Sequence, residues 1–184
     1  MLRNGADSWG VVAKGFHWLM AALILVQIAL GILAVNWPMS PAKIELFVWH
    51  KSLGVLLLAL VALRLLWRMG DAPPALPADT PSWERMAARG GHVLLYALMI
   101  ALPVTGWVVN SAANVPFRIF WLIPLPAIVA PDEAAAELFA LLHDGLAAAL
   151  AVVLVAHIGA ALRHHFIKRN RVLLRMLPGT WGAR

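Results

Sequence analysis

Four long apolar stretches dominate this chain and restrict the folds that are open to it. We expect them to form helices over approximately residues 17–37, 46–67, 91–111 and 134–166. Each stretch reaches the length of roughly 20 residues that a helix needs to cross the hydrocarbon core of a bilayer. Lipid offers the backbone no hydrogen-bond partners, whereas a helix satisfies its own N–H and C=O groups. The sequence therefore predicts an all-α fold, a transmembrane four-helix bundle.

The composition supports a membrane protein and excludes several other classes. Of the 184 residues, 62% are hydrophobic and 13% are charged, which is too apolar for a soluble domain of this size. The formal net charge of +6 does not indicate a nucleic-acid partner, because the basic residues flank the apolar stretches. Without cysteine, the chain cannot form disulfides, thiolate metal sites or a covalent c-type haem attachment.

The segments around the apolar stretches add no second domain, and we expect one domain over residues 1–184. The first stretch runs uncharged from Gly15 to Ala42, too long for the apolar part of a signal peptide, so we interpret it as a retained span. Residues 117–131 (FRIFWLIPLPAIVAP) are apolar but broken by prolines. They predict an interfacial loop or a short helix lying on the membrane.

The distribution of basic residues predicts the orientation. Four spans bring both termini to one side, and twelve of the 15 Lys and Arg residues fall there: Arg3, Lys14, Arg64, Arg68, Arg85, Arg89, Arg163, Lys168, Arg169, Arg171, Arg175 and Arg184. Only Lys43, Lys51 and Arg118 fall on the other side. Because cytoplasmic flanks are rich in Lys and Arg, we expect cytoplasmic termini. In a bacterium the protein would then be a multi-pass protein of the inner membrane.

Two histidines in the last apolar stretch indicate a function. His143 and His157 are 14 residues apart, close to four helical turns, so both imidazoles leave one face of a helix with an offset of roughly 40°. They lie roughly 21 Å apart along the helix axis, most of the thickness of a bilayer core. One helix thus offers an imidazole near each membrane surface, which is typical of two haems stacked across a membrane.

The other histidines supply partners at matched depths. Near the outer surface His50 faces His143, whereas near the inner surface His157 can pair with either His17 or His92. Bis-histidine ligation needs two imidazoles from facing helices, so His17 and His92 cannot both share one iron with His157. A zinc site is a weaker alternative because it needs three or four clustered ligands. We expect His164 and His165, in the basic end of the chain, to be solvated side chains.

Several short motifs, taken in order, make the chain resemble the bacterial cytochrome b561 family, whose better-studied members act as superoxide oxidases. The motifs are His17-Trp18, His50-Lys51-Ser52-Leu53-Gly54, Arg64-Leu65-Leu66-Trp67-Arg68, Gly91-His92, Leu102-Pro103, Gly106, His143 with His157, His164-His165, and Leu173-Leu174-Arg175-Met176-Leu177-Pro178. The resemblance implies one haem b between His17 and His157 and a second between His50 and His143. It also implies that His92 is not an axial ligand.

Charged residues suggest how the haems and a substrate would be bound. Haem propionates need cationic partners near the membrane surface, and the candidates are Lys51 outside and Arg64, Arg68 and Arg163 inside. Topology anchoring explains the three arginines equally well. On the outer face, Lys43, Lys51 and Arg118 favour an approaching anion, and four carboxylates oppose it: Glu45, Asp132, Glu133 and Glu137.

The resemblance implies a superoxide:ubiquinone oxidoreductase that oxidises periplasmic superoxide to oxygen and reduces ubiquinone. The alternative is an electron-carrier or anchor subunit that serves a separate dehydrogenase or a soluble redox partner. A haem-free transporter or scaffold is a third class, and it predicts no haem absorbance in the purified protein. In each case membrane lipid is the surrounding partner.

Overall fold

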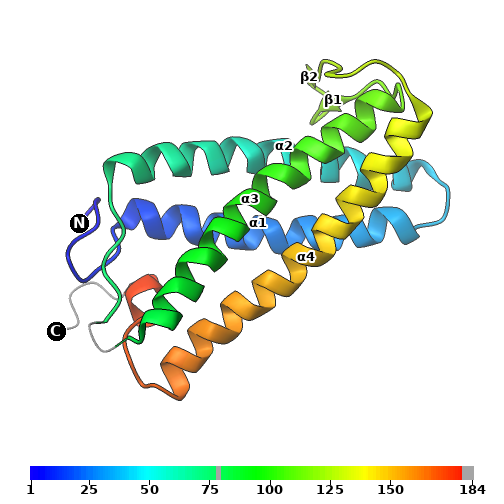
Figure 1. Cartoon of the computed structure of the whole chain (residues 1–184). Coiled ribbons are helices and arrows are strands. Elements are labelled where there is room, and N and C mark those ends of the chain that lie inside the picture. Colours follow the sequence, from blue (N-terminus) through cyan, green and yellow to red (C-terminus); the bar gives the residue numbers. More distant parts are fainter. Residues whose placement is uncertain (78–79, 180–184) are drawn as a thin grey trace.

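The computed structural model describes residues 1–77 and 80–179, and it confirms a helical protein with four candidate spans. The long helices are α1 (Val11–Asn36), α2 (Pro41–Gly70), α3 (Ser82–Ala112) and α4 (Glu133–Phe166), each long and apolar enough to cross a membrane. Helices α1 and α2 form one antiparallel hairpin, and α3 and α4 form a second that crosses the first at an angle (Figure 1). The minor elements are β1 (Arg118–Ile119), β2 (Ile123–Pro124) and the 3₁₀ turn η1 (Leu174–Met176).

The helices begin earlier than the apolar stretches predict. Helix α3 begins at Ser82 rather than near residue 91, because the polar segment SWERMAARG continues the helix beyond the apolar part. Helix α2 begins at Pro41 rather than near residue 46. Proline suits the first helical turn, where its missing N–H has no helical partner, and the Ser40 side chain caps this end by accepting from the backbone N–H of Lys43.

A small apolar core joins all four helices at the middle of the bundle. It consists of Met20 and Ile24 from α1, Leu57 and Val61 from α2, Leu98 from α3, and Leu150 from α4. Leu150 is the one buried residue of α4, and it lies seven residues from both His143 and His157. The core therefore separates the two histidine levels, about 10 Å of helix rise from each.

The connection between α3 and α4 contains a short hairpin. Strands β1 and β2 pair antiparallel, and Phe120 and Trp121 in the turn adopt positive φ angles of 48° and 62°. The backbone N–H of Phe120 donates to Ser52 Oγ at 2.8 Å, and the Trp49 ring packs edge-on against both turn aromatics. The short helix considered as an alternative for this segment is wrong. Its prolines remove helical donors, and the segment folds back on α2 instead.

A charged cluster ties the ends of α3 and α4 together at the opposite end of the molecule. The Glu84 side chain is 7% exposed and forms ion pairs with Arg163 at 3.1 Å and with Lys168. His164 Nε2 lies 3.8 Å from the same carboxylate, and the His164 side chain is only 14% exposed. The expectation that His164 is solvated is therefore wrong. Arg184, counted among the basic residues, lies outside the described residues.

Candidate functional site

Helix α4 shares two histidine pairs with the first helical hairpin. His50 on α2 and His143 on α4 have ring centroids 6.3 Å apart, with ring planes at 76°. His17 on α1 and His157 on α4 have centroids 6.2 Å apart, with planes at 58°. We call the first the turn-side pair, because His50 lies near the start of α2 and so near the α1–α2 turn, and the second the terminus-side pair, because His17 lies near the start of α1.

The ring separations match what one metal ion between two imidazoles requires. Two metal–nitrogen bonds of about 2 Å, with roughly 1.2 Å from each nitrogen to its ring centre, give a centroid separation of about 6.4 Å. Both pairs have this spacing although they draw on three different helices. Within the described residues, no three His, Asp or Glu side chains cluster as a metal site would need. The arrangement therefore suits an iron whose other ligands come from a macrocycle.

His92 on α3 also reaches the terminus-side pair. Its ring centroid lies 5.5 Å from that of His157, so both partners considered from the sequence contact the same imidazole. This separation is shorter than two metal bonds need, whereas the separation between His17 and His157 matches it. The geometry thus favours His17 as the partner of His157. His92 lies beside that pair.

The turn-side imidazoles are oriented by hydrogen bonds through Nδ1. His50 Nδ1 lies 3.2 Å from the backbone carbonyl of Gln27, and the Gln27 side-chain amide donates to the His50 carbonyl at 2.8 Å. A carbonyl can only accept, so His50 Nδ1 carries the proton and its Nε2 keeps a free lone pair. His143 Nδ1 lies 3.1 Å from Thr105 Oγ1 on α3. Both rings thus direct Nε2 away from their hydrogen-bond partners.

Two glycines make room for these rings. A Cβ atom at Gly31 would lie 3.0 Å from His50 Cε1, and one at Gly106 would lie 3.3 Å from His143 Cε1. Both distances are shorter than ordinary van der Waals contact. The absence of a side chain at each glycine therefore allows the imidazole to lie close to the neighbouring helix.

The backbone of α4 packs closely against only one of the other long helices. Extensive backbone contacts join α3 to α4, α1 to α2 and α2 to α3, but α4 has no comparable contact with α1 or α2. Yet the partners of its histidines come from those two helices. Gln27 Oε1, next to the turn-side pair, is buried without a hydrogen-bond partner among the described residues. These features fit a group that lies between the two hairpins.

The four basic residues considered as partners of haem propionates make different contacts. Lys51 donates to Asn110 Oδ1 at 2.7 Å and lies over the Phe117 ring. Arg64 and Arg68 both lie over the Tyr96 ring, at 5.6 and 5.8 Å. Arg163 does not join these two arginines, because it pairs with Glu84.

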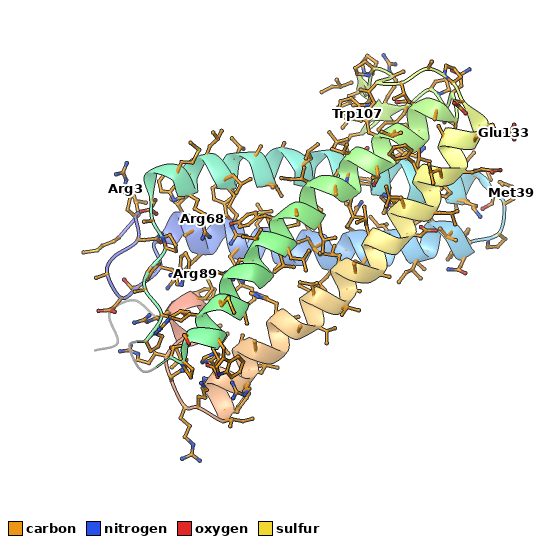
Figure 2. The ribbon with its side chains drawn as sticks, in the orientation of Figure 1. Arg3, Met39, Arg68, Arg89, Trp107 and Glu133 are labelled. Carbon is orange, nitrogen blue, oxygen red and sulfur yellow. The ribbon has the colours of Figure 1, made fainter. Side chains whose placement is uncertain are left out.

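Arg64 and Arg68 also line a shallow, open pocket at the terminus end, together with Asn4, Trp9, Ala13, Phe16, Trp67, Asp71 and Tyr96. Figure 2 shows Arg3, Arg68 and Arg89 at the terminus end, and Met39, Trp107 and Glu133 at the other. The two surfaces of the bundle therefore differ in charge.

Sequence reasoning missed Gln27, Thr105 and Asn110, the polar residues that contact the histidines or Lys51. A signal was present, because polar side chains inside apolar spans are costly and usually have a specific partner. Gln27 and Thr105 each interrupt a long apolar stretch. Their partners lie on other helices, which is why the sequence alone did not pair them with His50 and His143.

Paired imidazoles held between membrane-spanning helices define a class, the haem b proteins that transfer electrons in membranes. Comparison with known sequences narrows that class. The family described as prokaryotic cytochrome b561 matches residues 8–179. The chain belongs to this family, which confirms the resemblance seen in the motifs and makes it a bacterial membrane protein that binds haem b and transfers electrons.

The relatives cover nearly the whole chain. This chain is 35% identical over 181 residues to cytochrome b561 homolog 2 of Escherichia coli (strain K12), and the match covers 95% of this chain and 93% of the relative. It is 30% identical over 171 residues to the probable superoxide oxidase CybB of Yersinia pestis, covering 91% and 94%. Cytochrome b561 homolog 1 of Escherichia coli (strain K12) is 26% identical over 163 residues, covering 88% and 92%.

Proposed function

We propose that this protein holds two b-type haems, one between His50 and His143 and one between His17 and His157. The observation that carries the proposal is that α4 contributes to two pairs, 14 residues apart, with ring separations of 6.3 and 6.2 Å. One metal ion per pair accounts for both separations. His92 is then a neighbour of the terminus-side pair and not an axial ligand.

The two histidine pairs would each hold one haem between the hairpins. When bound, each haem would supply a one-electron iron couple. Lys51 is suited to a propionate near the turn-side pair, and Arg64 and Arg68 to propionates near the terminus-side pair. Arg163 is occupied by Glu84, so we assign it to holding α4 against α3.

The reaction that we propose is the oxidation of superoxide with reduction of ubiquinone. Two superoxide ions each lose one electron and leave as oxygen, and one ubiquinone takes up two electrons and two protons to become ubiquinol. The support is the family and the name of the Yersinia pestis relative. Superoxide would react on the turn side, which we propose faces the periplasm, where Lys51 lies next to His50.

Haem content tests the ligand assignment. Purified wild-type protein should contain two haems per chain, and the His50→Ala and His157→Ala variants should each lose about one. The haem that remains shows that each variant still folds. A wild type with a single haem, or a variant that keeps both, would contradict the assignment.

A superoxide pulse tests the reaction. In a stopped-flow mixer, the purified oxidised protein should show haem reduction without any protein partner, and His50→Ala should lose most of the rapid phase. The competing function is an electron-carrier or anchor subunit, and the 35% identical relative is named only as a cytochrome b561 homolog. Reduction that requires an added dehydrogenase or soluble cytochrome would favour that function instead.

A further inference from the structure

Thr105 is the side chain that hydrogen-bonds to His143, next to the main-chain carbonyl of Leu102. It lies on α3, is 6% exposed, and its hydroxyl oxygen is 3.1 Å from His143 Nδ1 and 2.9 Å from the backbone carbonyl oxygen of Leu102. The next residue, Gly106, borders Cε1 of the same ring. Two consecutive residues of α3 thus lie beside the same imidazole.

The two contacts of the hydroxyl determine where its proton points. A hydroxyl has one hydrogen to donate, and a backbone carbonyl can only accept, so the hydrogen of Thr105 goes to Leu102. The oxygen then offers a lone pair to His143 Nδ1, which must carry the ring proton. Nε2 of His143 is left unprotonated, in the form that can bind a metal ion.

The other three imidazoles of the two pairs lack such a side chain. His50 Nδ1 donates to a main-chain carbonyl, that of Gln27, which no substitution removes. The rings of His17 and His157 contact other aromatic rings, and their nitrogens have no hydrogen-bond partner within residues 1–77 and 80–179. Both Nδ1 atoms of the turn-side pair are therefore hydrogen-bonded, whereas neither of those in the terminus-side pair has such a bond to a described residue.

A hydrogen bond from Nδ1 makes an imidazole a stronger electron donor to its metal ion. We infer that Thr105 is a positioning residue that fixes the tautomer of His143 and lowers the reduction potential of the turn-side haem. The inference rests on the proposed ligand pairs. Its consequence is a direction for electron transfer, from the turn-side haem to the terminus-side haem, whose ligands lack these hydrogen bonds.

The test compares one substitution that removes the hydroxyl group of Thr105 with one that keeps it. Thr105→Val keeps the shape and removes the hydroxyl, whereas Thr105→Ser keeps the hydroxyl. Each is measured by spectroelectrochemical titration of purified, haem-loaded protein, in the wild-type background and in a His17→Ala background that should retain only the turn-side haem. Thr105→Val should change the ferric–ferrous equilibrium constant of that haem by up to about tenfold toward the ferrous form, about 59 mV for one electron.

The turn-side haem of Thr105→Ser should keep its wild-type reduction potential. The reduction potential of the terminus-side haem should stay unchanged in both variants. Loss of the turn-side haem in Thr105→Val with retention in Thr105→Ser also supports the inference. An unchanged potential in Thr105→Val overturns it, and so does an equal shift or equal haem loss in both variants, since the hydroxyl would then not be the cause. If His17→Ala itself keeps two haems, the failure belongs to the ligand assignment and not to Thr105.

Discussion

Gly31 shows, at the scale of single residues, how closely the histidines are surrounded. A methyl group there would lie 3.0 Å from His50 Cε1 and 3.4 Å from Nδ1, the atom that bonds to Gln27. Helix propensity alone would favour alanine over glycine by up to about 1 kcal/mol. The contact with the ring works in the opposite direction, because the imidazole would have to shift away from its hydrogen-bond partner.

We predict that Gly31→Ala weakens haem binding at the turn-side pair by about tenfold, the lower end of the effect of disturbing a ligand's supporting contacts. Haem per polypeptide and the potential of the turn-side haem measure this effect. Gly15→Ala is the matched control on the same helix, because a Cβ there meets nothing within 4 Å. Full haem content and an unchanged potential in Gly31→Ala would show that the ring can move freely.

The sequence identified the histidines but not the residues that orient them. His143 and His157 are recognisable because a helix places residues 14 apart on nearly the same face, a local rule. Gly31 and Thr105 act on rings that are 19 and 38 positions away along the chain. Only the packing of four different helices brings these residues together, and no local pattern encodes that packing.

Glu84 organises the terminus end at the scale of secondary-structure elements. It lies in the first turn of α3, while Arg163, His164 and Lys168 lie at the end of α4 and just after it. A carboxylate near a helix N-terminus and cations near a helix C-terminus also suit both helix dipoles. One buried carboxylate therefore holds the ends of two spans and three basic side chains in place.

We predict that Glu84→Gln loosens the end of α4, because a neutral amide cannot balance the positive charges of Arg163 and Lys168. Hydrogen exchange of residues 163–170 in detergent should become severalfold faster, with tryptic cleavage after Lys168 and Arg169 increased to match. Glu137→Gln is the control, since Glu137 is an exposed glutamate on α4. Equal protection in both variants would mean that the apolar contacts of α4 suffice without the ion pairs.

The number of helices and several of their ends could be predicted from the sequence, including both ends of α4 to within one residue, but the starts of α1, α2 and α3 could not. Hydropathy locates the part of a helix that lies in lipid, and α3 continues for about two turns beyond it as a polar segment that includes Glu84. The hairpin of β1 and β2 could not be predicted either, because its turn is held by a hydrogen bond from the Phe120 N–H to Ser52 Oγ, 68 positions away. Each of these features depends on a tertiary contact.

The whole molecule is divided into two levels by its apolar core. Leu150 lies midway between His143 and His157, and core residues of the other three helices surround it. Each histidine pair therefore lies toward one end of the bundle, with a packed apolar layer between the pairs. The orientation of the bundle then decides which pair lies nearer the cytoplasm.

The charge bias predicts that the terminus end faces the cytoplasm, and the sequence offers a direct test because it contains no cysteine. Ala6 and Ala127 are exposed at opposite ends of the bundle. In spheroplasts, Ala127→Cys should react with a membrane-impermeant maleimide at once, and Ala6→Cys only after the membrane is permeabilised. The reverse pattern would place the turn-side pair at the cytoplasmic surface, where periplasmic superoxide cannot reach it, and the terminus-side pair would then be the site of electron entry.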